Sequence, residues 1–306
     1  MRGIAYDRFG GVEVLQLRED LPEPPVGPDS VLVRTRAAGV NPVDLGIRQG
    51  GLAGFFPHHF PIIPGWDLAG VVEAVGPAVV DFQPGDEVFG YLRRDDVQWG
   101  TTAELVSAPQ RCVAHKPESL SFTEAGAVPL AGLTAYQALT EALAVGEGDR
   151  VLVHRAAGGV GFFAVQIAVA LGAHVIGTAS PRNHGFLTEA GAAEVLDYSA
   201  GPISGQLSEP VDAVLDLNGG DSLTDAPEQV RDVSRIASVV DPSVNELGGR
   251  YVFVRPERHD LEELARMADA GQLRVAVAKA FPLERTAEAH ELVAGGHVRG
   301  KVVVTL

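Results

Sequence analysis

The sequence predicts an α/β protein in which a region of short β-strands precedes a doubly wound parallel sheet. In the first hundred or so residues, short β-type runs at 31–36, 69–75 and 87–90 are separated by turns rich in proline and glycine. From Ser121 onward, helical segments alternate with strand-like runs. Within residues 150–178, a strand, a glycine-rich turn, a helix and a second strand follow one another. These three observations support the fold class.

The N-terminal region is interpreted as a compact all-β barrel, because closely spaced short strands with such turns are typical of that architecture. Cys112 lies in a β-like run at 111–115, where a buried structural thiol is expected.

The middle of the chain follows a strand–helix–strand pattern. Residues 151–154 are apolar and β-branched, as in a buried parallel strand. Residues 156–161 turn the chain, a mostly apolar helix follows, and Gly172 ends it in the position that favours a left-handed residue. The later elements expected are strands at 174–178, 195–198, 213–217, 236–240 and 250–254, a helix at 259–270 and a final β run at 301–306.

The glycine-rich turn indicates a dinucleotide site. A helix that begins directly after such a turn presents free N–H groups and the positive end of its dipole to a pyrophosphate. The predicted contacts are Ala157, Gly158, Gly159, Val160 and Gly161. A glycine turn alone is more often structural, but the surrounding strand–turn–helix–strand order favours nucleotide binding.

The composition narrows the function classes. A formal charge of −16 on 306 residues disfavours nucleic acids and anionic membranes, because both bind surfaces rich in Lys and Arg. Cys112 is the only cysteine, which excludes an intramolecular disulfide and a thiolate zinc cluster. The N-terminus lacks a signal-peptide core, and the longest apolar region, 160–178, is interrupted by polar residues and glycine. We expect a cytoplasmic protein without a membrane span.

Six short motifs occur in order along the chain. They are GVNPVD at 39–44, PGWDLAGVV at 64–72, QPGDEV at 83–88, LTAY at 133–136, AAGGVG at 156–161 and GGHVRGKVV at 295–303. Together they resemble the medium-chain dehydrogenase/reductase superfamily, in its zinc-independent quinone oxidoreductase branch, over essentially the whole chain. The resemblance implies a GroES-like β-barrel domain from residues 1–120 and 275–306. It also implies a Rossmann domain, 121–274, inserted between those two segments.

The residues at the zinc positions of the superfamily differ from metal ligands. Asn41 stands where zinc alcohol dehydrogenases have their first cysteine, and Gly65-Trp66-Asp67 stands where they have Gly-His-Glu. His58, His59 and Asp67 form the only local group suggestive of a metal, and loop histidines are far more often surface residues. We expect no metal. Without a Lewis acid, reduction of an electrophilic quinone or enone is favoured over alcohol oxidation.

Two positions depart from the family pattern. Arg155 replaces a small residue at the start of the glycine turn, and its side chain either points outward and leaves the turn intact or hinders it. Gly46 and Leu52 lie where some relatives carry aromatic substrate residues, which leaves quinone specificity open.

NADPH is the expected cofactor. After the second strand no carboxylate precedes Glu189, whereas Ser180 and Arg182 can bind a 2′-phosphate. Ser180 and Pro181 also suit the start of the next helix, and both roles can hold at once. Lys116, Lys279 and Lys301 are the only lysines, so arginine must serve as the phosphate partner.

The resemblance implies further site residues. Asn41, Asp44 and Tyr91 are the candidate catalytic residues, Tyr91 as a weak proton donor. Asp44 alternatively caps a short helix. Additional cofactor contacts are expected from Asn41, Thr134, Tyr198, Asn218, Phe253, Val254 and Lys301. Tyr91, Trp99, Phe55 and Phe60 are either pocket walls or core.

The leading hypothesis is an NADPH-dependent reductase that transfers hydride to a small-molecule electrophilic acceptor, a quinone or an α,β-unsaturated carbonyl. An enoyl reductase of a fatty-acid or polyketide pathway and a non-catalytic NADPH-binding protein remain alternatives. The family resemblance also implies a homodimer, for which the apolar edge strand at 250–254 is suited.

Overall fold

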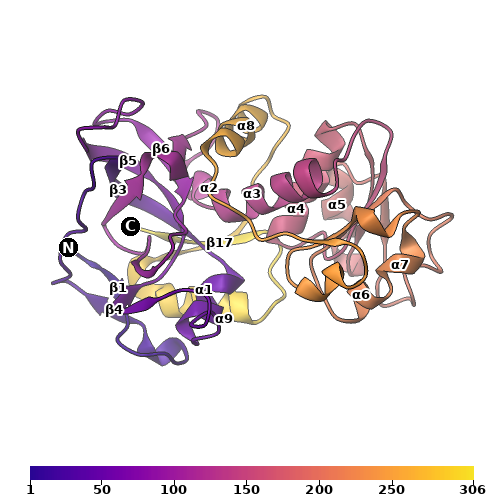
Figure 1. The fold of residues 1–306 in the computed structure, drawn as a ribbon, viewed down its shortest axis with the longest axis horizontal. Coiled ribbons are helices and arrows are strands. Elements are labelled where there is room, and N and C mark those ends of the chain that lie inside the picture. The colour runs from indigo at the N-terminus through magenta and orange to yellow at the C-terminus, as the bar shows by residue number, and fades with distance from the viewer. The chain divides into compact units, whose positions relative to one another are not determined.

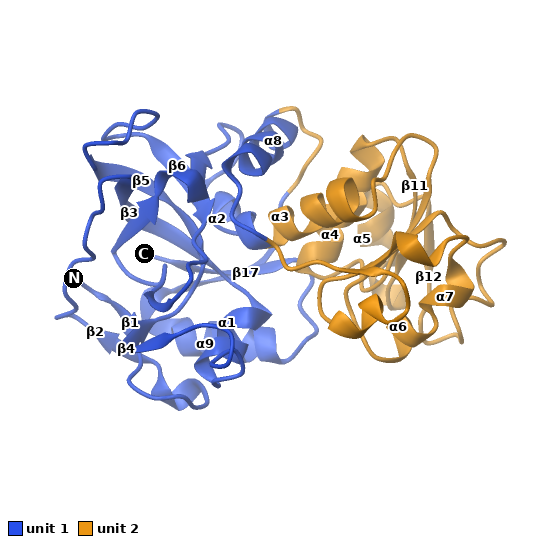
Figure 2. Cartoon of the chain, in the orientation of Figure 1, with its two compact units in different colours: residues 1–130, 255–269, 275–306 blue, residues 131–254, 270–274 orange.

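The computed structural model describes residues 1–306 and divides into two compact units (Figure 2). Unit 1 comprises residues 1–130, 255–269 and 275–306, and unit 2 comprises residues 131–254 and 270–274. Figure 1 labels their helices and strands.

Unit 1 is built around a seven-stranded sheet. Its path is β16–β17–β3–β5–β6–β9, and β8 also pairs with β3. The strands are β3 (Ser30–Val40), β5 (Asp67–Val75), β6 (Glu87–Tyr91), β8 (Leu105–Pro109), β9 (Val113–His115), β16 (Val277–Pro282) and β17 (Lys301–Thr305). The long β3 alternates buried and partly exposed side chains over its first half, because successive side chains of a strand point to opposite faces of the sheet. The C-terminal β17 pairs antiparallel with the second half of β3, so both ends of the chain contribute to one sheet.

Smaller elements complete unit 1. Two-stranded sheets pair β1 (Gly3–Ala5) with β2 (Gln16–Arg18) and β4 (His58–Ile63) with β7 (Val97–Trp99). The helices are α1 (Pro42–Arg48), α2 (Phe122–Ala125), α8 (Arg258–Asp269) and α9 (Thr286–Ala294), with short 3₁₀ turns at Val12–Val14, Gln110–Cys112 and Leu283–Arg285.

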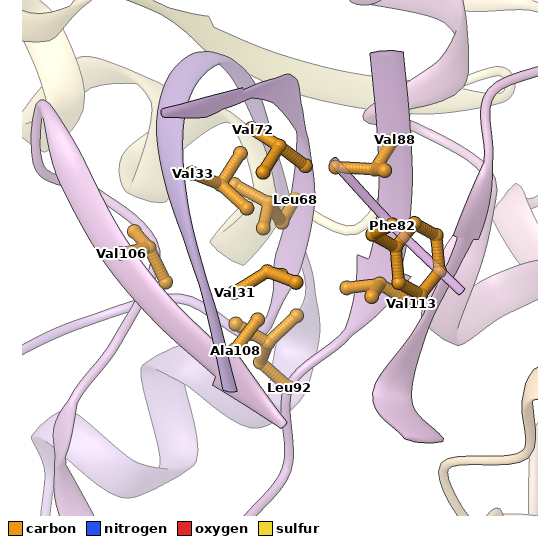
Figure 3. Packing of buried hydrophobic residues seen from close by; sticks show 10 residues of the cluster. All are labelled: Val31, Val33, Leu68, Val72, Phe82, Val88, Leu92, Val106, Ala108 and Val113. Carbon is orange, nitrogen blue, oxygen red and sulfur yellow. The ribbon is translucent and has the colours of Figure 1, made fainter. Parts of the chain in front are cut away.

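The core of this sheet is aliphatic. Figure 3 shows β-branched and leucine side chains from β3, β5, β6 and β8 directed toward one another, together with Phe82. The cluster comprises Val31, Val33, Leu68, Val72, Phe82, Val88, Leu92, Val106, Ala108 and Val113, all buried. Burial of about ten such side chains contributes roughly 1.5–3 kcal/mol for each of the larger ones.

Two segments that we expected in the Rossmann domain lie in unit 1. Residues 121–130 contain α2, which packs against β3 and β5, and residues 255–269 contain α8, which packs against β9. These packing contacts arise between segments distant in the chain, and the sequence pattern of the helices does not reveal them.

Unit 2 contains the predicted doubly wound parallel sheet. Its strand order is β12–β11–β10–β13–β14–β15, and every neighbouring pair is parallel. The strands are β10 (Arg150–Val153), β11 (His174–Thr178), β12 (Glu194–Leu196), β13 (Ala213–Asp216), β14 (Ile236–Ser238) and β15 (Arg250–Tyr251). The direction of strand order reverses between β10 and β13, which is where doubly wound sheets bind ligands.

The helices of unit 2 follow the expected alternation. They are α4 (Gly159–Ala170), α5 (His184–Glu189), α6 (Asp221–Thr224), α7 (Ala226–Gln229) and most of α3 (Pro129–Gln137), which continues into a π turn at Ala138–Ala142. Short 3₁₀ turns lie at Pro181–Asn183, Val233–Arg235 and Pro242–Asn245. Gly172 follows α4 with a φ of +85°, as its predicted role at the helix end requires.

The last strand of the parallel sheet is shorter than predicted. β15 covers only Arg250–Tyr251 instead of 250–254, because its neighbour β14 ends at Ser238 and offers no longer ladder. Tyr251 donates its N–H to Asn245 Oδ1 at 3.0 Å, so a side chain already covers part of this edge. The strand predicted at 195–198 begins one residue earlier and ends two residues earlier, at Glu194–Leu196. Cys112 is buried as expected but ends a 3₁₀ turn, not a strand.

None of the helices combines the length and the apolar character that crossing a lipid bilayer requires.

Candidate active site

A buried polar cluster in unit 1 unites Asn41, Asp67 and Lys301. Asn41 follows β3, Asp67 begins β5 and Lys301 begins β17, and β3 pairs with both other strands. The exposed fractions of the three residues are 2%, 0% and 5%. Strand pairing therefore assembles residues that are far apart in the chain.

Hydrogen bonds satisfy most of the polar atoms of this cluster. Asn41 Nδ2 donates to Asp67 Oδ2 at 2.8 Å, and Lys301 Nζ donates to Asn41 Oδ1. The backbone N–H of Leu130 donates to Asp67 Oδ1 at 2.7 Å. Lys301 Nζ lies 3.6 Å from Asp67 Oδ2, so the buried carboxylate and ammonium neutralise one another.

Asp44 extends the cluster along α1. Asn41 occupies the N-cap position, and the Asp44 Oδ2 atom accepts its backbone N–H at 2.7 Å. Asp44 thus supports the helix start from the third helical position and is not itself the N-cap residue. Burial raises the pKa of Asp44 to about 7, the charge of Asp67 adds to this shift, and the Asn41 N–H and Lys301 oppose it. Burial therefore favours the protonated form of this carboxyl far more than water does.

Aromatic side chains lie beside this cluster in unit 1. Trp66 contacts Tyr91 edge-on with ring centroids 5.9 Å apart, and Phe56 contacts Trp66 at 6.3 Å. Tyr91 is buried, and burial raises the pKa of its hydroxyl far above the usual value, which weakens it as a proton donor. Phe60 is 39% exposed and Phe55 is 80% exposed, so neither is core. Trp99 is partly buried and packs against a small core cluster.

The residues at the zinc positions of the superfamily do not fit zinc. Asn41 and Trp66 are poor ligands, and the ammonium of Lys301 in the same cluster would repel a cation. His58 uses Nδ1 in a 2.7 Å contact with the Phe56 carbonyl. No three His, Cys, Asp or Glu side chains of the chain gather closely enough to hold a metal ion.

The glycine turn of unit 2 opens α4 as predicted. Gly158 is the N-cap residue, and the first intrahelical bond is donated by Phe162 to the Gly158 carbonyl. The preceding amides, those of Gly159, Val160 and Gly161, have no carbonyl partner within the helix. A Cβ atom on Gly161 would lie 2.6 Å from the Cα of Ala156, so only glycine allows this close approach. The turn fits the pyrophosphate of a dinucleotide.

The glycine turn forms even though Arg155, at its start, has a long side chain. Its φ of +51° lies in the left-handed region, which glycine adopts with less strain. The N–H of Arg155 donates to Thr178 Oγ1 at 3.1 Å, and the N–H of Ala156 donates to the Thr178 carbonyl at 3.0 Å. These two bonds fix the glycine turn beside the end of β11.

The other predicted cofactor contacts of unit 2 follow the carboxyl ends of its strands. Tyr198 follows β12, Ser180 and Arg182 follow β11, Asn218 follows β13, and Phe253 and Val254 follow β15. Because all six strands are parallel, these positions share one edge of the sheet with the glycine turn. Among them, Tyr198, Arg182, Asn218 and Phe253 are exposed. Thr134 is buried in α3.

Ser180 occupies the N-cap position of a 3₁₀ turn, but its side chain does not form the capping hydrogen bond. It precedes the 3₁₀ turn Pro181–Asn183, with Pro181 in the first position, yet the Ser180 side chain makes no capping hydrogen bond. Asn183 Nδ2 lies 3.4 Å from Ser180 Oγ.

Two residues with central positions were missing from the predicted site. Asp67 was considered only as a metal ligand, and its partners became visible through strand pairing alone. Asp216 ends β13 fully buried and accepts hydrogen bonds from Ser238 Oγ at 2.7 Å and Ser222 Oγ at 2.8 Å. It also accepts the Gly219 N–H at 3.0 Å, which shapes the loop after β13. The sequence did offer one signal for Asp216, because it is a carboxylate at the carboxyl end of a predicted strand.

Comparisons with known proteins agree with this architecture. Residues 27–118 match the family model of the alcohol dehydrogenase GroES-like domain, and residues 190–304 match that of the zinc-binding dehydrogenases. The human mitochondrial NAD(P)H oxidoreductase RTN4IP1 is 32% identical over 349 residues, which covers 98% of this chain and 88% of the relative.

Solved structures extend the comparison. The quinone oxidoreductase from Coxiella burnetii superposes with a TM-score of 0.91 at 34% identity and covers 100% of this chain and 99% of its own. The Escherichia coli quinone oxidoreductase, solved in complex with NADPH, gives a TM-score of 0.85 at 27% identity with both chains covered completely. These matches confirm the predicted fold class, a GroES-like domain with a Rossmann domain. The chain therefore belongs to the medium-chain dehydrogenase/reductase superfamily, in the branch of the quinone oxidoreductases, and is an oxidoreductase that uses a nicotinamide cofactor.

Proposed function

We propose that this protein is an NADPH-dependent, zinc-independent reductase whose acceptor is a quinone or an α,β-unsaturated carbonyl. One observation supports this most directly. Asn41 and Asp67 stand at the zinc positions of the superfamily, and the buried ammonium of Lys301 donates a hydrogen bond to Asn41 and pairs with Asp67. Alcohol oxidation depends on a Lewis acid that polarises the oxygen, whereas an electrophilic acceptor does not need one. When bound, the reduced nicotinamide supplies the hydride.

The preference for NADPH rests on the end of β11. Arg182 is exposed there, and Ser180 has a hydroxyl that caps no helix. A guanidinium and a hydroxyl suit a 2′-phosphate, whereas a carboxylate would suit the 2′-hydroxyl of NADH. The printed title of the E. coli relative names NADPH as its ligand, in agreement with this proposal.

Assembly and location are part of the proposal. We propose a homodimer that forms along the β15 edge of the parallel sheet. A cytoplasmic location is consistent with the single, buried, free cysteine.

A panel of acceptors tests the activity. Quinones, enones and enoyl thioesters are each mixed with the protein and NADPH, and the loss of NADPH absorbance is followed with and without a chelator. We expect turnover of quinones or enones that a chelator leaves unchanged. Turnover restricted to enoyl thioesters would favour the enoyl reductase, and NADPH binding without any turnover would favour a non-catalytic role. Stoichiometric zinc in the purified protein would contradict the proposal.

A further inference from the structure

The fully buried carboxylate of Asp216 accepts hydrogen bonds from the loop after β13 and from the end of β14. Its Oδ1 atom accepts the backbone N–H of Asn218 at 3.2 Å, that of Gly219 at 3.1 Å and Ser222 Oγ at 2.8 Å. Its Oδ2 atom accepts the Gly219 N–H at 3.0 Å and Ser238 Oγ at 2.7 Å. The donors are all uncharged, and hydrogen bonds to a carboxylate are roughly twice as strong as those between neutral groups. The carboxylate therefore fixes the backbone of this loop.

Ser238 extends the network to the loop after β14. Its Oγ atom, which donates to Asp216, also accepts the backbone N–H groups of Val240 at 3.3 Å and Asp241 at 3.1 Å. The two loops also approach each other directly, because a Cβ atom on Gly219 would lie 3.4 Å from Val240 Cγ2. Asp216 and Ser238 thus hold the two loops together as one unit.

These loops lie beside the glycine turn. β10 and β13 are adjacent and parallel, and the N–H of His154, directly after β10, donates to the Leu215 carbonyl on β13 at 3.0 Å. The glycine turn after β10 fits the pyrophosphate, and in the proposed function Ser180 and Arg182 after β11 bind the 2′-phosphate of the adenosine half. β11 and β13 flank β10 on opposite sides. The other half of the coenzyme, nicotinamide mononucleotide, therefore extends toward the loops after β13 and β14.

We propose that Asp216 is a positioning residue, which holds the loops after β13 and β14 in the conformation that binds the nicotinamide mononucleotide half of the coenzyme. This inference rests on the proposed function and deepens it. Asp216 is fully buried, so it acts through the backbone groups that it bonds, whereas Asn218 is exposed on the loop.

The two glycines of the loop explain why a positioning residue is needed. Gly219 and Gly220 have φ values of +71° and +56°, and glycine adopts many other conformations as readily. The hydrogen bonds to Asp216 select one conformation among these. If a binding-competent conformation is populated only in part, the apparent dissociation constant rises by the inverse of that fraction.

The test compares Asp216→Asn and Ser238→Ala with the control Asp232→Asn. Because the Gly219 N–H lies within 3.1 Å of both Asp216 oxygens, either orientation of an asparagine amide sets its NH₂ group against this donor. Ser238→Ala leaves the Gly219 bond intact and removes the link between the two loops. Asp232 likewise accepts a backbone N–H, that of Ser234 at 2.9 Å, but it precedes β14 and lies at the opposite edge of the sheet.

Two ligands report on the two halves of the coenzyme. NADPH contains both halves, and adenosine 2′,5′-bisphosphate contains only the adenosine half. Titration calorimetry measures the dissociation constant of each. The fluorescence of bound NADPH is emitted by the dihydronicotinamide ring and reports on the surroundings of that ring. A loss of folding alone would not distinguish between the two ligands.

We expect Asp216→Asn to raise the dissociation constant of NADPH roughly tenfold, as for a loop that is competent about one-tenth of the time, and that of the bisphosphate less than about twofold. Ser238→Ala should raise the dissociation constant of NADPH roughly two- to fivefold with the same selectivity. The fluorescence of NADPH bound to Asp216→Asn should shift toward that of the free coenzyme. Asp232→Asn should resemble the parent in every measurement.

Equal losses of both ligands in Asp216→Asn would show that this residue serves only the folding of unit 2, and would overturn the proposal. If Asp216→Asn does not fold, Ser238→Ala decides. A parent-like dissociation constant for NADPH then overturns the proposal, and a selective loss supports it. If NADH proves to be the coenzyme, NADH and AMP replace the two ligands with the same expectations.

Failure of the positioning role and failure of the proposed function are distinguishable, because binding does not require turnover. A selective loss of NADPH binding in Asp216→Asn, without reduction of any acceptor by the parent, would support the positioning role and overturn the proposed reductase activity. Reduction of acceptors by the parent, together with unchanged NADPH binding by Asp216→Asn, would support the activity and overturn the positioning role.

Discussion

The ammonium of Lys301 lies 3.6 Å from Asp67 Oδ2, so the last strand of the chain supplies the counter-ion of a fully buried carboxylate on β5. Removing one partner of a buried ion pair leaves the other charge without compensation. We expect Lys301→Met to lower the free energy of unfolding by about 3–5 kcal/mol, as measured by urea denaturation. Lys279→Met, at an exposed position of β16, serves as the control and should change it by no more than about 1 kcal/mol, because it loses only an exposed contact of Nζ with the Phe281 ring. A Lys301→Met protein as stable as its parent would show that Asp67 is held neutral.

Asp44 should make the free energy of unfolding fall as pH rises, which is the opposite of the effect of a carboxyl group whose pKa is lowered by folding. Its pKa is about 7 in the folded protein and near the ordinary 3.8 when unfolded, so the folded state binds the extra proton between these values. The contribution of this group to stability is therefore greatest at low pH and declines by about 1.4 kcal/mol per pH unit as pH rises toward 7. Between pH 5 and 7, the free energy of unfolding of Asp44→Asn should fall less steeply than that of the parent. Parallel curves would contradict the raised pKa.

Arg182 tests the coenzyme preference. If it pairs with the 2′-phosphate, Arg182→Ala removes a charge-assisted hydrogen bond of about 1.5–3 kcal/mol. NADPH affinity should then fall roughly tenfold to hundredfold, while NADH affinity barely changes. Ser180→Ala should have the smaller effect of a neutral hydroxyl. Titration calorimetry with both coenzymes measures these changes, and equal losses for NADPH and NADH would mean that Arg182 acts through folding or the pyrophosphate.

The glycine turn tolerates no side chain at Gly161. Gly161→Ala places a methyl group against the backbone of Ala156, and we expect a loss of about 1–3 kcal/mol in stability together with weaker NADPH binding. Gly185→Ala in α5 is the matched control, because its added Cβ meets nothing within 4 Å and should stabilise the helix by about 0.5–1 kcal/mol. Thermal unfolding measures both. Equal melting temperatures for the two variants would contradict the close approach.

The proposed homodimer predicts a mass twice that of the chain. Light scattering at micromolar concentration measures it, and a monomer at that concentration would refute the proposal. Because the Tyr251 N–H is already bonded to Asn245, we expect Asn245→Ala to leave the dimer intact.

Much of the fold follows from local patterns in the chain. The β-type run at 31–36, the glycine turn and the left-handed Gly172 each depend on the geometry of a few neighbouring residues, and all three appear as predicted. The end of β15 was mispredicted for the opposite reason. Its apolar residues permit a longer strand, but the ladder stops where β14 stops.

The glycine turn and the polar cluster of unit 1 also differ in whether local sequence determines them. The glycine turn at the start of α4 could be located in advance, since a short motif sets its geometry, whereas the cofactor contacts expected after β11 stay a prediction. The cluster of Asn41, Asp67 and Lys301 spans 260 positions and forms because β3 pairs with β5 and β17. Local sequence specifies backbone preference and residue chemistry, whereas burial, ion pairing and the pKa of Asp44 depend on neighbours that only the folded chain brings together.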